Sequence, residues 1–227
     1  PPPPPMPVGR TSPIGPRSAS VPTGARPEPT ASSRGHHPCR ALGGSNRWVE
    51  TLGGSERLRL ATVSPVANSP SADLVLSPLK GDPRPLREWV TTFHLASVVI
   101  DPFTNESSWI LDTAARILRS FAGAAARVNF IVTATADEAK QFLGPLADEF
   151  LVFADPNRDA VRQLSLQMLP AFVFIQGDLS VPAAAEGWRP VEWRKVAQAI
   201  ATTTSWSAPT IPGPKDPSPY AGTPALV

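Results

Sequence analysis

The sequence predicts an α/β fold: a three-layer sandwich in which helices cover both faces of a mostly parallel central sheet, with an antiparallel edge hairpin. Three observations support this prediction. Short apolar runs rich in β-branched residues alternate with amphipathic stretches of helical period. The resulting order of elements is β-α-β-α-β-α-β-β-α. The last two apolar runs, within residues 171–185, flank Gly177-Asp178, a dipeptide typical of hairpin turns.

The distribution of proline divides the chain into three parts. Of its 29 prolines, twelve precede residue 39 and six follow residue 208. We therefore expect a disordered Pro/Ser/Gly/Arg-rich arm over residues 1–72, one domain over residues 73–206 and a Pro-rich tail over residues 207–227. The middle part, roughly 135 residues, is long enough to bury one hydrophobic core.

The arm leaves several alternatives open. Pro1–Pro5 is either a polyproline II ligand for an SH3-like or WW-like partner or an inert end, and we favour the inert end. His36-His37-Pro38-Cys39 holds three potential metal ligands, but no second group completes a site and we predict no metal. Because the chain does not begin with Met, our hypothesis is that much of the arm is upstream sequence read in frame, with the native start nearer Val66 or Val75.

The domain is predicted to begin with a loop, a short helix and a strand. Pro83 and Pro85 delimit the loop, and residues 86–93 form the helix. Residues 95–100 (LASVVI) are a continuous apolar run, as expected for a strand that is covered on both faces.

A turn over residues 101–109 leads from this strand into a helix that reaches Phe121 and is closed by Gly123. Asp112 and Arg116 lie on its outer side four residues apart, a spacing that favours an ion pair. Five apolar side chains share the inner face: Ile110, Ala114, Ile117, Leu118 and Phe121.

The next strand, residues 128–132, precedes a helix with a clear start and end. Thr135 and Glu138 have the spacing of a capping box, and Gly144-Pro145 should break the helix. Its predicted inward side chains are Ala139, Phe142, Leu143 and Leu146.

The last elements follow the same alternation. After a strand over residues 151–153, Asp155-Pro156 should cap a short helix with Pro at its first position and Val161 and Leu164 inward. Strands over residues 171–175 and 179–185 form the hairpin. Pro190 opens a final helix with four inward side chains: Trp193, Val196, Ala197 and Ile200.

Charge and cysteine content exclude several classes of protein. The net charge of +2 combines +5 in residues 1–72 with −3 in residues 73–227, so the predicted domain lacks the basic surface of a nucleic-acid-binding protein. The chain has a single cysteine, Cys39 in the arm, which excludes a disulfide framework within the chain. No apolar run approaches the length of about 18 residues that a membrane span needs, and there is no secretory signal pattern. We expect a cytoplasmic protein that binds neither nucleic acid nor membrane.

With Leu169-Pro170 placed directly before the hairpin, the element order resembles the thioredoxin fold. The extra strand and helix over residues 128–150 are similar to the peroxiredoxin and thiol–disulfide-interchange branch of that superfamily. The resemblance covers about residues 86–203 and implies a "D-P"-type turn at Asp155-Pro156, a cis-proline at Pro170 and the family's glycine at Gly187.

The resemblance fails at the reactive group. The family has a cysteine at the helix N-terminus, where the helix dipole lowers the thiol pKa. Here that position falls on about Ser107 or Ser108, and a hydroxyl cannot alternate between thiolate and disulfide. We therefore expect no cofactor and no dithiol oxidoreductase or peroxidase activity from the domain itself.

Serine catalysis lacks the groups it needs. A serine nucleophile requires a general base within reach, and His94, the one histidine after residue 37, lies at the far end of the preceding strand. No G-x-S-x-G elbow is present. We interpret the four short polar side chains of the turn as helix-capping groups: Thr104, Asn105, Ser107 and Ser108.

These observations favour a redox-inactive thioredoxin-like domain that binds a protein or peptide as a scaffold of unknown pathway. In this fold the backbone beside the cis-proline can pair with an extended peptide. The predicted groove lies between the turn and the Leu169-Pro170 loop and is lined by Thr104, Asn105, Ser107, Ser108, Trp109, Leu169 and Pro170. The alternative is a thioredoxin-like or peroxiredoxin-like oxidoreductase or antioxidant protein that uses a partner's thiol.

Two features near the groove stay open at this point. Trp193 is predicted to lie in the core, whereas Trp188, beside Gly187, is either buried or part of a binding surface. The tail is a disordered end, a polyproline II ligand or an extended strap that packs back on the domain, since Trp206, Ile211 and Tyr220 offer apolar anchors. The sequence does not set the oligomeric state.

Overall fold

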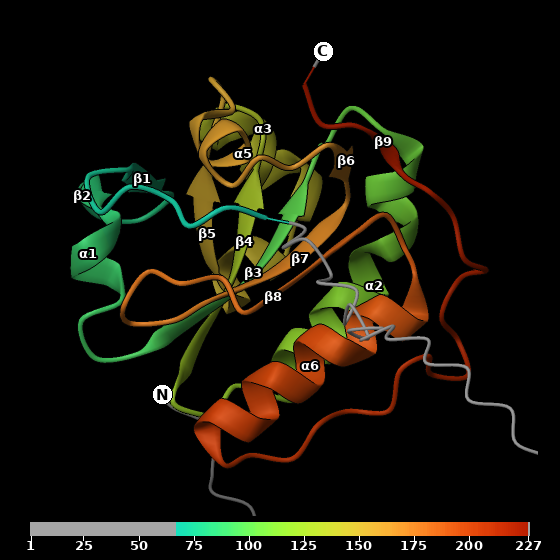
Figure 1. The fold of residues 1–227 in the computed structure, drawn as a ribbon. Coiled ribbons are helices and arrows are strands. Elements are labelled where there is room, and N and C mark those ends of the chain that lie inside the picture. Colours follow the sequence, from blue (N-terminus) through green and yellow to red (C-terminus); the bar gives the residue numbers. More distant parts are fainter. Residues whose placement is uncertain (1–66, 227) are drawn as a thin grey trace, which may run out of the picture. The chain divides into compact units, whose positions relative to one another are not determined.

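The computed structural model describes residues 67–226, which contain a seven-stranded mixed sheet (Figure 1). Its strands, in the spatial order β2-β1-β5-β4-β3-β7-β8, are β1 (Val75–Pro78), β2 (Arg84–Pro85), β3 (His94–Ile100), β4 (Ala126–Val132), β5 (Leu151–Ala154), β7 (Ala171–Ile175) and β8 (Ala183–Glu186). The three central strands β5, β4 and β3 run parallel. The strands on either side of them pair antiparallel, so the sheet is mixed where the sequence predicted a mostly parallel one, and β7 with β8 forms the predicted edge hairpin.

Helices pack on both faces of this sheet, as the α/β prediction requires. They are α1 (Leu86–Trp89), α2 (Asn105–Arg119), α3 (Ala136–Leu143), α4 (Leu146–Glu149), α5 (Asp159–Gln163) and α6 (Pro190–Thr204). One hydrophobic cluster joins the sheet to α2, α3, α4 and α6, and a second joins it to α1 and α5. The three-layer arrangement is therefore confirmed. Within residues 67–226, no helix has the length and apolar character to cross a bilayer.

Strand β3 shows why a continuous apolar run predicts a central strand. Successive side chains of a strand point to opposite faces, so Val98 packs in the first cluster and Val99 in the second, both fully buried. β3 pairs with β4 on one side and with β7 on the other. Helix α2 follows it, and all five side chains predicted to face inward are buried.

The capping box of α3 is confirmed. The Thr135 hydroxyl accepts a hydrogen bond from the Glu138 amide, and the Glu138 carboxylate accepts one from the Thr135 amide. The carboxylate also accepts a hydrogen bond from the Thr135 hydroxyl at 2.6 Å, and this bond, together with the one from the amide, lowers the pKa of that carboxyl. α3 ends at Gly144, whose φ is +53°, and Pro145 precedes the separate helix α4.

Several predicted elements have different bounds in the structure, among them three that differ by three or more residues at one end. The helix over residues 86–93 ends at Trp89, and the strand over residues 179–185 begins only at Ala183. Pro156 is not the first residue of a helix, because α5 begins at Asp159 after a turn. The Asp155 carboxylate still caps α5, since it accepts the amides of the first helical residues at 2.7–3.4 Å.

Two other features have outcomes that depend on the tail: the sequence left the burial of Trp188 open, and the ion pair expected between Asp112 and Arg116 is replaced by another. Trp188 is fully buried, with its ring edge-on to Trp193 at a centroid distance of 5.1 Å. Arg116 makes its ion pair with Asp216 of the tail at 2.7 Å, not with Asp112. Both outcomes have the same cause: the tail packs against these side chains, and the sequence did not predict the position of the tail.

The tail packs back on the domain as an extended strap that crosses α6 and α2 (Figure 1). Trp206 donates from Nε1 to the Ser120 carbonyl at 2.7 Å, and Ile211 is buried in the first cluster. Further along, the Asp216 carboxylate is buried and accepts hydrogen bonds from Arg116 and Thr113. The strap ends in β9 (Thr223–Pro224), which pairs with β6 (Met168–Leu169) as a separate two-stranded sheet.

The other end of the described chain also contacts the domain. Ala67 is buried in the second cluster, and the Asn68 amide donates to the Leu164 carbonyl at 3.0 Å. Residues 67–72, which the sequence assigned to the arm, therefore form part of the packed structure. The predictions for Pro1–Pro5 and for His36-His37-Pro38-Cys39 lie outside the described residues.

Candidate functional site

The turn between β3 and α2 is closed by hydrogen bonds among its own residues. The Ser107 hydroxyl is fully buried and accepts the Asp101 amide at 2.9 Å. The Thr104 hydroxyl donates to the Asp101 carbonyl at 2.9 Å and lies 3.0 Å from the Ser107 hydroxyl, within hydrogen-bond distance. Thr104 is the N-cap of α2, but its side chain makes no capping bond. The capping interpretation of this turn is therefore wrong, because the Thr104 and Ser107 hydroxyls bond to Asp101 and the Ser108 hydroxyl bonds to the Thr104 carbonyl.

A buried ion pair connects this turn to the start of α5. The Asp101 carboxylate accepts a hydrogen bond from the Arg158 guanidinium at 2.7 Å, with the side chains 4% and 18% exposed. The other oxygen of Asp101 accepts the Phe103 amide at 3.0 Å. Arg158 also donates to the Ala225 carbonyl of the strap at 2.7 Å. Its guanidinium thus holds the turn, α5 and the strap together.

Ser107 has no general base within the described residues. Its hydroxyl is already engaged by Asp101 and Thr104. His94, the only histidine in residues 67–226, lies at the opposite end of β3, where its Nδ1 accepts the Gly177 amide at 3.1 Å. The arrangement supports the folding of the turn and offers no route to a serine alkoxide.

The second wall of the predicted groove is β6 with the following Leu169-Pro170 peptide bond, which is cis. Leu169 and Pro170 are buried. The Glu186 carboxylate accepts the amides of Gln167 and Met168, each at 3.1 Å, and so holds the start of this segment. The backbone edge of Met168–Leu169 pairs with the strap.

The strap pairs with this edge as an antiparallel β-strand. Met168 lies opposite Pro224, and Leu169 lies opposite Thr223. The Ala225 amide donates to the Gln167 carbonyl at 2.8 Å, which extends the pairing by one residue. The edge that the sequence predicts to bind a peptide is therefore occupied by the chain's own tail.

Tyr220 of the strap contacts the first wall. Its hydroxyl donates to the Glu106 carbonyl at 2.6 Å, and its ring meets Trp109 edge-on at a centroid distance of 5.6 Å. Burial raises the pKa of the Tyr220 hydroxyl above its ordinary value, which keeps it a donor. The backbones of Tyr220 and Trp188 exchange two hydrogen bonds, at 2.9 and 3.0 Å.

Two glycines allow the strap to approach this closely. Gly222 has φ +88°, and a Cβ there would lie 2.4 Å from the Leu169 carbonyl oxygen and 3.2 Å from the Gly187 Cα. Gly187 has φ +63°, and a Cβ there would lie 2.2 Å from the Ala221 carbonyl oxygen. Real Cβ atoms do not come that near to backbone, so both positions require glycine while the strap is docked.

The strap contacts two of the seven predicted site residues, one on each predicted wall of the groove. Trp109 contacts Tyr220, and Leu169 pairs with Thr223. Thr104 and Ser107 lie within the turn, and Pro170 is buried behind β6. Asn105 and Ser108 are exposed. Sequence reasoning did not assign Asp101, Arg158, Gly222 and Ala225 to the site, whereas it named Tyr220 as a possible anchor of the tail.

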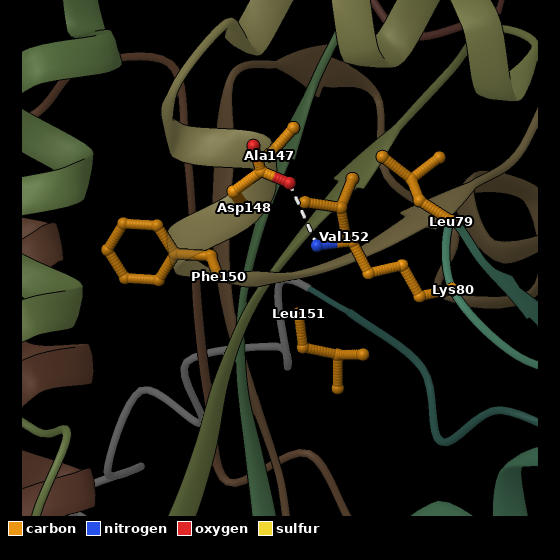
Figure 2. Close-up of a pocket in the computed structure, with 7 residues that line it drawn as sticks. All are labelled: Leu79, Lys80, Ala147, Asp148, Phe150, Leu151 and Val152. Carbon is orange, nitrogen blue, oxygen red and sulfur yellow. Dashed lines mark hydrogen bonds and ion pairs between the residues drawn. The ribbon is translucent and has the colours of Figure 1, made fainter. Parts of the chain in front are cut away.

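Hollows elsewhere on the domain are shallow or small. Figure 2 shows one beside β5, a cavity of about 120 Å³ floored by Leu79, Phe150 and Val152. An exposed ion pair between Lys80 and Asp148, 2.8 Å long, crosses it. Ligand pockets commonly hold roughly 300–1,000 Å³, so this cavity is too small for one. It lies apart from the strap, and none of the predicted site residues lines it.

Comparison with known proteins identifies the fold. No protein-family model and no curated protein is significantly similar to the sequence. Among solved structures, the chain resembles a protein assigned as the thiol:disulfide interchange protein DsbE of Chlorobium tepidum, with 18% identity and a TM-score of 0.52 over 62% of this chain and 99% of that one. It also resembles a protein assigned as a thioredoxin of Neisseria meningitidis, with 14% identity and a TM-score of 0.50 over 60% of this chain and 89% of that one. The chain therefore has the thioredoxin-like fold, built with no cysteine in residues 67–226.

Proposed function

We propose that this domain is a redox-inactive thioredoxin-like binding module that takes an extended protein segment along the edge of Met168–Leu169. The observation that supports this proposal most strongly is the antiparallel pairing of that edge with Thr223–Pro224. An edge that accepts one extended segment offers the same backbone donors and acceptors to another, which is the basis of β-augmentation. The partner is a protein or peptide.

The described part of the chain contains no group that could perform thiol chemistry. Residues 67–226 contain no cysteine, and the Ser107 hydroxyl is buried in the hydrogen bonds of its turn. The alternative, an oxidoreductase or antioxidant protein that works with a partner's thiol, gains no separate support from the geometry. The cytoplasmic location remains a prediction.

The docked strap sets the conditions for binding. A segment tethered to its site competes at an effective concentration on the order of millimolar. A peptide added to the wild-type chain must displace residues 220–225, so its apparent affinity is low. A change that weakens the strap without altering the groove should raise that affinity.

The two facing glycines provide such a change and its matched counterpart. Gly222→Ala places the obstructing Cβ on the strap, so the strap leaves and the groove stays intact. Gly187→Ala places it on the domain, where it obstructs the strap and any peptide that follows the same path. Gly81→Ala is the control, because Gly81 has φ +102° and a Cβ there meets nothing within 4 Å.

The experiment measures fluorescence anisotropy of a labelled peptide with the sequence of residues 217–227, titrated with each full-length chain. We expect Gly222→Ala to bind it at least about tenfold more tightly than wild type, a gain of about 1.4 kcal/mol. Gly81→Ala should match wild type, and Gly187→Ala should not bind. The proposal fails if folded Gly222→Ala does not bind the peptide, or if Gly187→Ala binds it equally well.

A further inference from the structure

From the strap we infer the class of ligand that the groove selects, an inference that rests on the proposed function. The ligand is an extended segment with an aromatic residue, a glycine two positions later and a small residue five positions after the aromatic. In the strap these positions are Tyr220, Gly222 and Ala225. Each is recognised by a different part of the domain.

The aromatic position is recognised by its ring and by its hydroxyl. Tyr220 lies against Trp109, and its hydroxyl donates to the Glu106 carbonyl at 2.6 Å. The two backbone bonds to Trp188 fix the direction in which the segment enters the groove. A phenylalanine keeps the ring contact and loses the hydrogen bond, whereas a small residue loses both.

The glycine position is set by a close crossing of two backbones. With φ +88° and the Leu169 carbonyl 2.4 Å from where a Cβ would lie, Gly222 accepts no side chain. Leu169 is fully buried, so its carbonyl cannot move aside without disturbing the core. The groove therefore excludes every residue except glycine at this point.

The small residue enters the second hydrophobic cluster. Ala225 is fully buried there, its amide donates to the Gln167 carbonyl at 2.8 Å, and its carbonyl accepts from Arg158 at 2.7 Å. A larger side chain would have to displace packed neighbours. Three other positions of the segment, Ala221, Pro224 and Leu226, are exposed, so their side chains are free to vary.

A peptide series tests this pattern on the full-length Gly222→Ala chain. The parent peptide spans residues 217–227, and single changes within the peptide are Y220A, Y220F, G222A and A225F, with P224A, L226S and a scrambled sequence as controls. We expect Y220A, G222A and A225F to weaken binding at least about tenfold, and Y220F about fivefold for one lost hydrogen bond. P224A and L226S should change it less than about threefold, and the scrambled peptide should not bind.

The outcomes separate this inference from the proposed function. If all peptides, the scrambled one included, bind Gly222→Ala equally and none binds Gly187→Ala, the groove takes extended segments without selecting them, and only the inference is overturned. If the parent peptide itself does not bind Gly222→Ala, the proposed function fails with it. Tight binding of the G222A peptide alone would refute the glycine position.

Discussion

Replacing Gly222 by alanine should release the end of the strap while leaving the domain folded. The new Cβ would lie 2.4 Å from the Leu169 carbonyl oxygen and 3.1 Å from its carbonyl carbon, so the two backbones must separate. The alanine would also keep φ near +88°, a conformation that costs an L-residue about 1–2 kcal/mol. Gly81→Ala shares the second cost, since its φ is +102°, and lacks the first.

Three backbone hydrogen bonds lost on separation give a lower bound on the effect, since the bonds from the Tyr220 hydroxyl to Glu106 and from Arg158 to the Ala225 carbonyl are lost as well. The three backbone bonds are the one from the Ala225 amide to Gln167 and the pair between Tyr220 and Trp188. At about 1 kcal/mol each, these three bonds stabilise docking by about 3 kcal/mol, which is about two orders of magnitude in the docked population. The remaining anchors of the strap, Ile211 and the buried Asp216, are untouched.

Hydrogen exchange measures this change locally. In Gly222→Ala, protection of the Tyr220 and Ala225 amides should fall by at least about 100-fold relative to Gly81→Ala, while the amides of β3 and β4 keep their protection. If both variants protect these two amides equally, the backbone crossing does not hold the strap and the reasoning is refuted. If protection falls throughout β3 as well, the strap is part of the core and cannot act as a displaceable segment.

Three other measurements follow from the same contacts. Burial raises the pKa of Tyr220 above its ordinary 10.0, so the neutral hydroxyl stabilises docking below pH 10, and this contribution is lost as the pH rises through the higher pKa of the docked state. Absorbance titration of this single tyrosine should therefore show a midpoint above 10 in the wild-type chain. In Gly222→Ala the midpoint should return toward 10. Arg116→Ala should lower the free energy of unfolding in urea by about 2 kcal/mol, since it leaves the buried Asp216 carboxylate without its cation, although the Arg116 side chain is 38% exposed. Arg119→Ala, which breaks an exposed pair, should cost under about 1 kcal/mol, and equal losses would contradict the role of Arg116 as the partner of a buried carboxylate. Insulin reduction and peroxide consumption by the full chain should stay at background, and turnover that survives Cys39→Ser would contradict a redox-inactive domain.

Periodicity and local signals were enough to predict the elements at the centre of the sheet. The apolar run at residues 95–100 and the inner face of the following helix depend on residues close in sequence, and both match the structure. The capping box at Thr135 and the first helical proline, Pro190, are equally local. The edge strands β1 and β2 were missed because they are short and contain prolines, so they show no alternation.

The candidate site was predicted only in part because its contacts join distant segments. The turn and the Leu169-Pro170 loop were expected to form a groove, yet what fills it comes from more than 50 residues further along the chain. The Arg116 ion pair spans 100 residues, and no sequence pattern within α2 indicates Asp216 as its partner. Trp188 is buried for the same reason, since its Nε1 donates to the Pro217 carbonyl of the strap at 2.8 Å.

An NMR structure of the Gly222→Ala chain bound to the peptide of residues 217–227 would show directly what occupies the groove. We expect intermolecular contacts that place the peptide's Thr223 antiparallel to Leu169 and its Ala225 beside Gln167, the positions that the strap holds in the intact chain. Contacts confined to another surface, or a groove that collapses and excludes the peptide once the strap has left, would contradict the proposal that this edge binds extended segments.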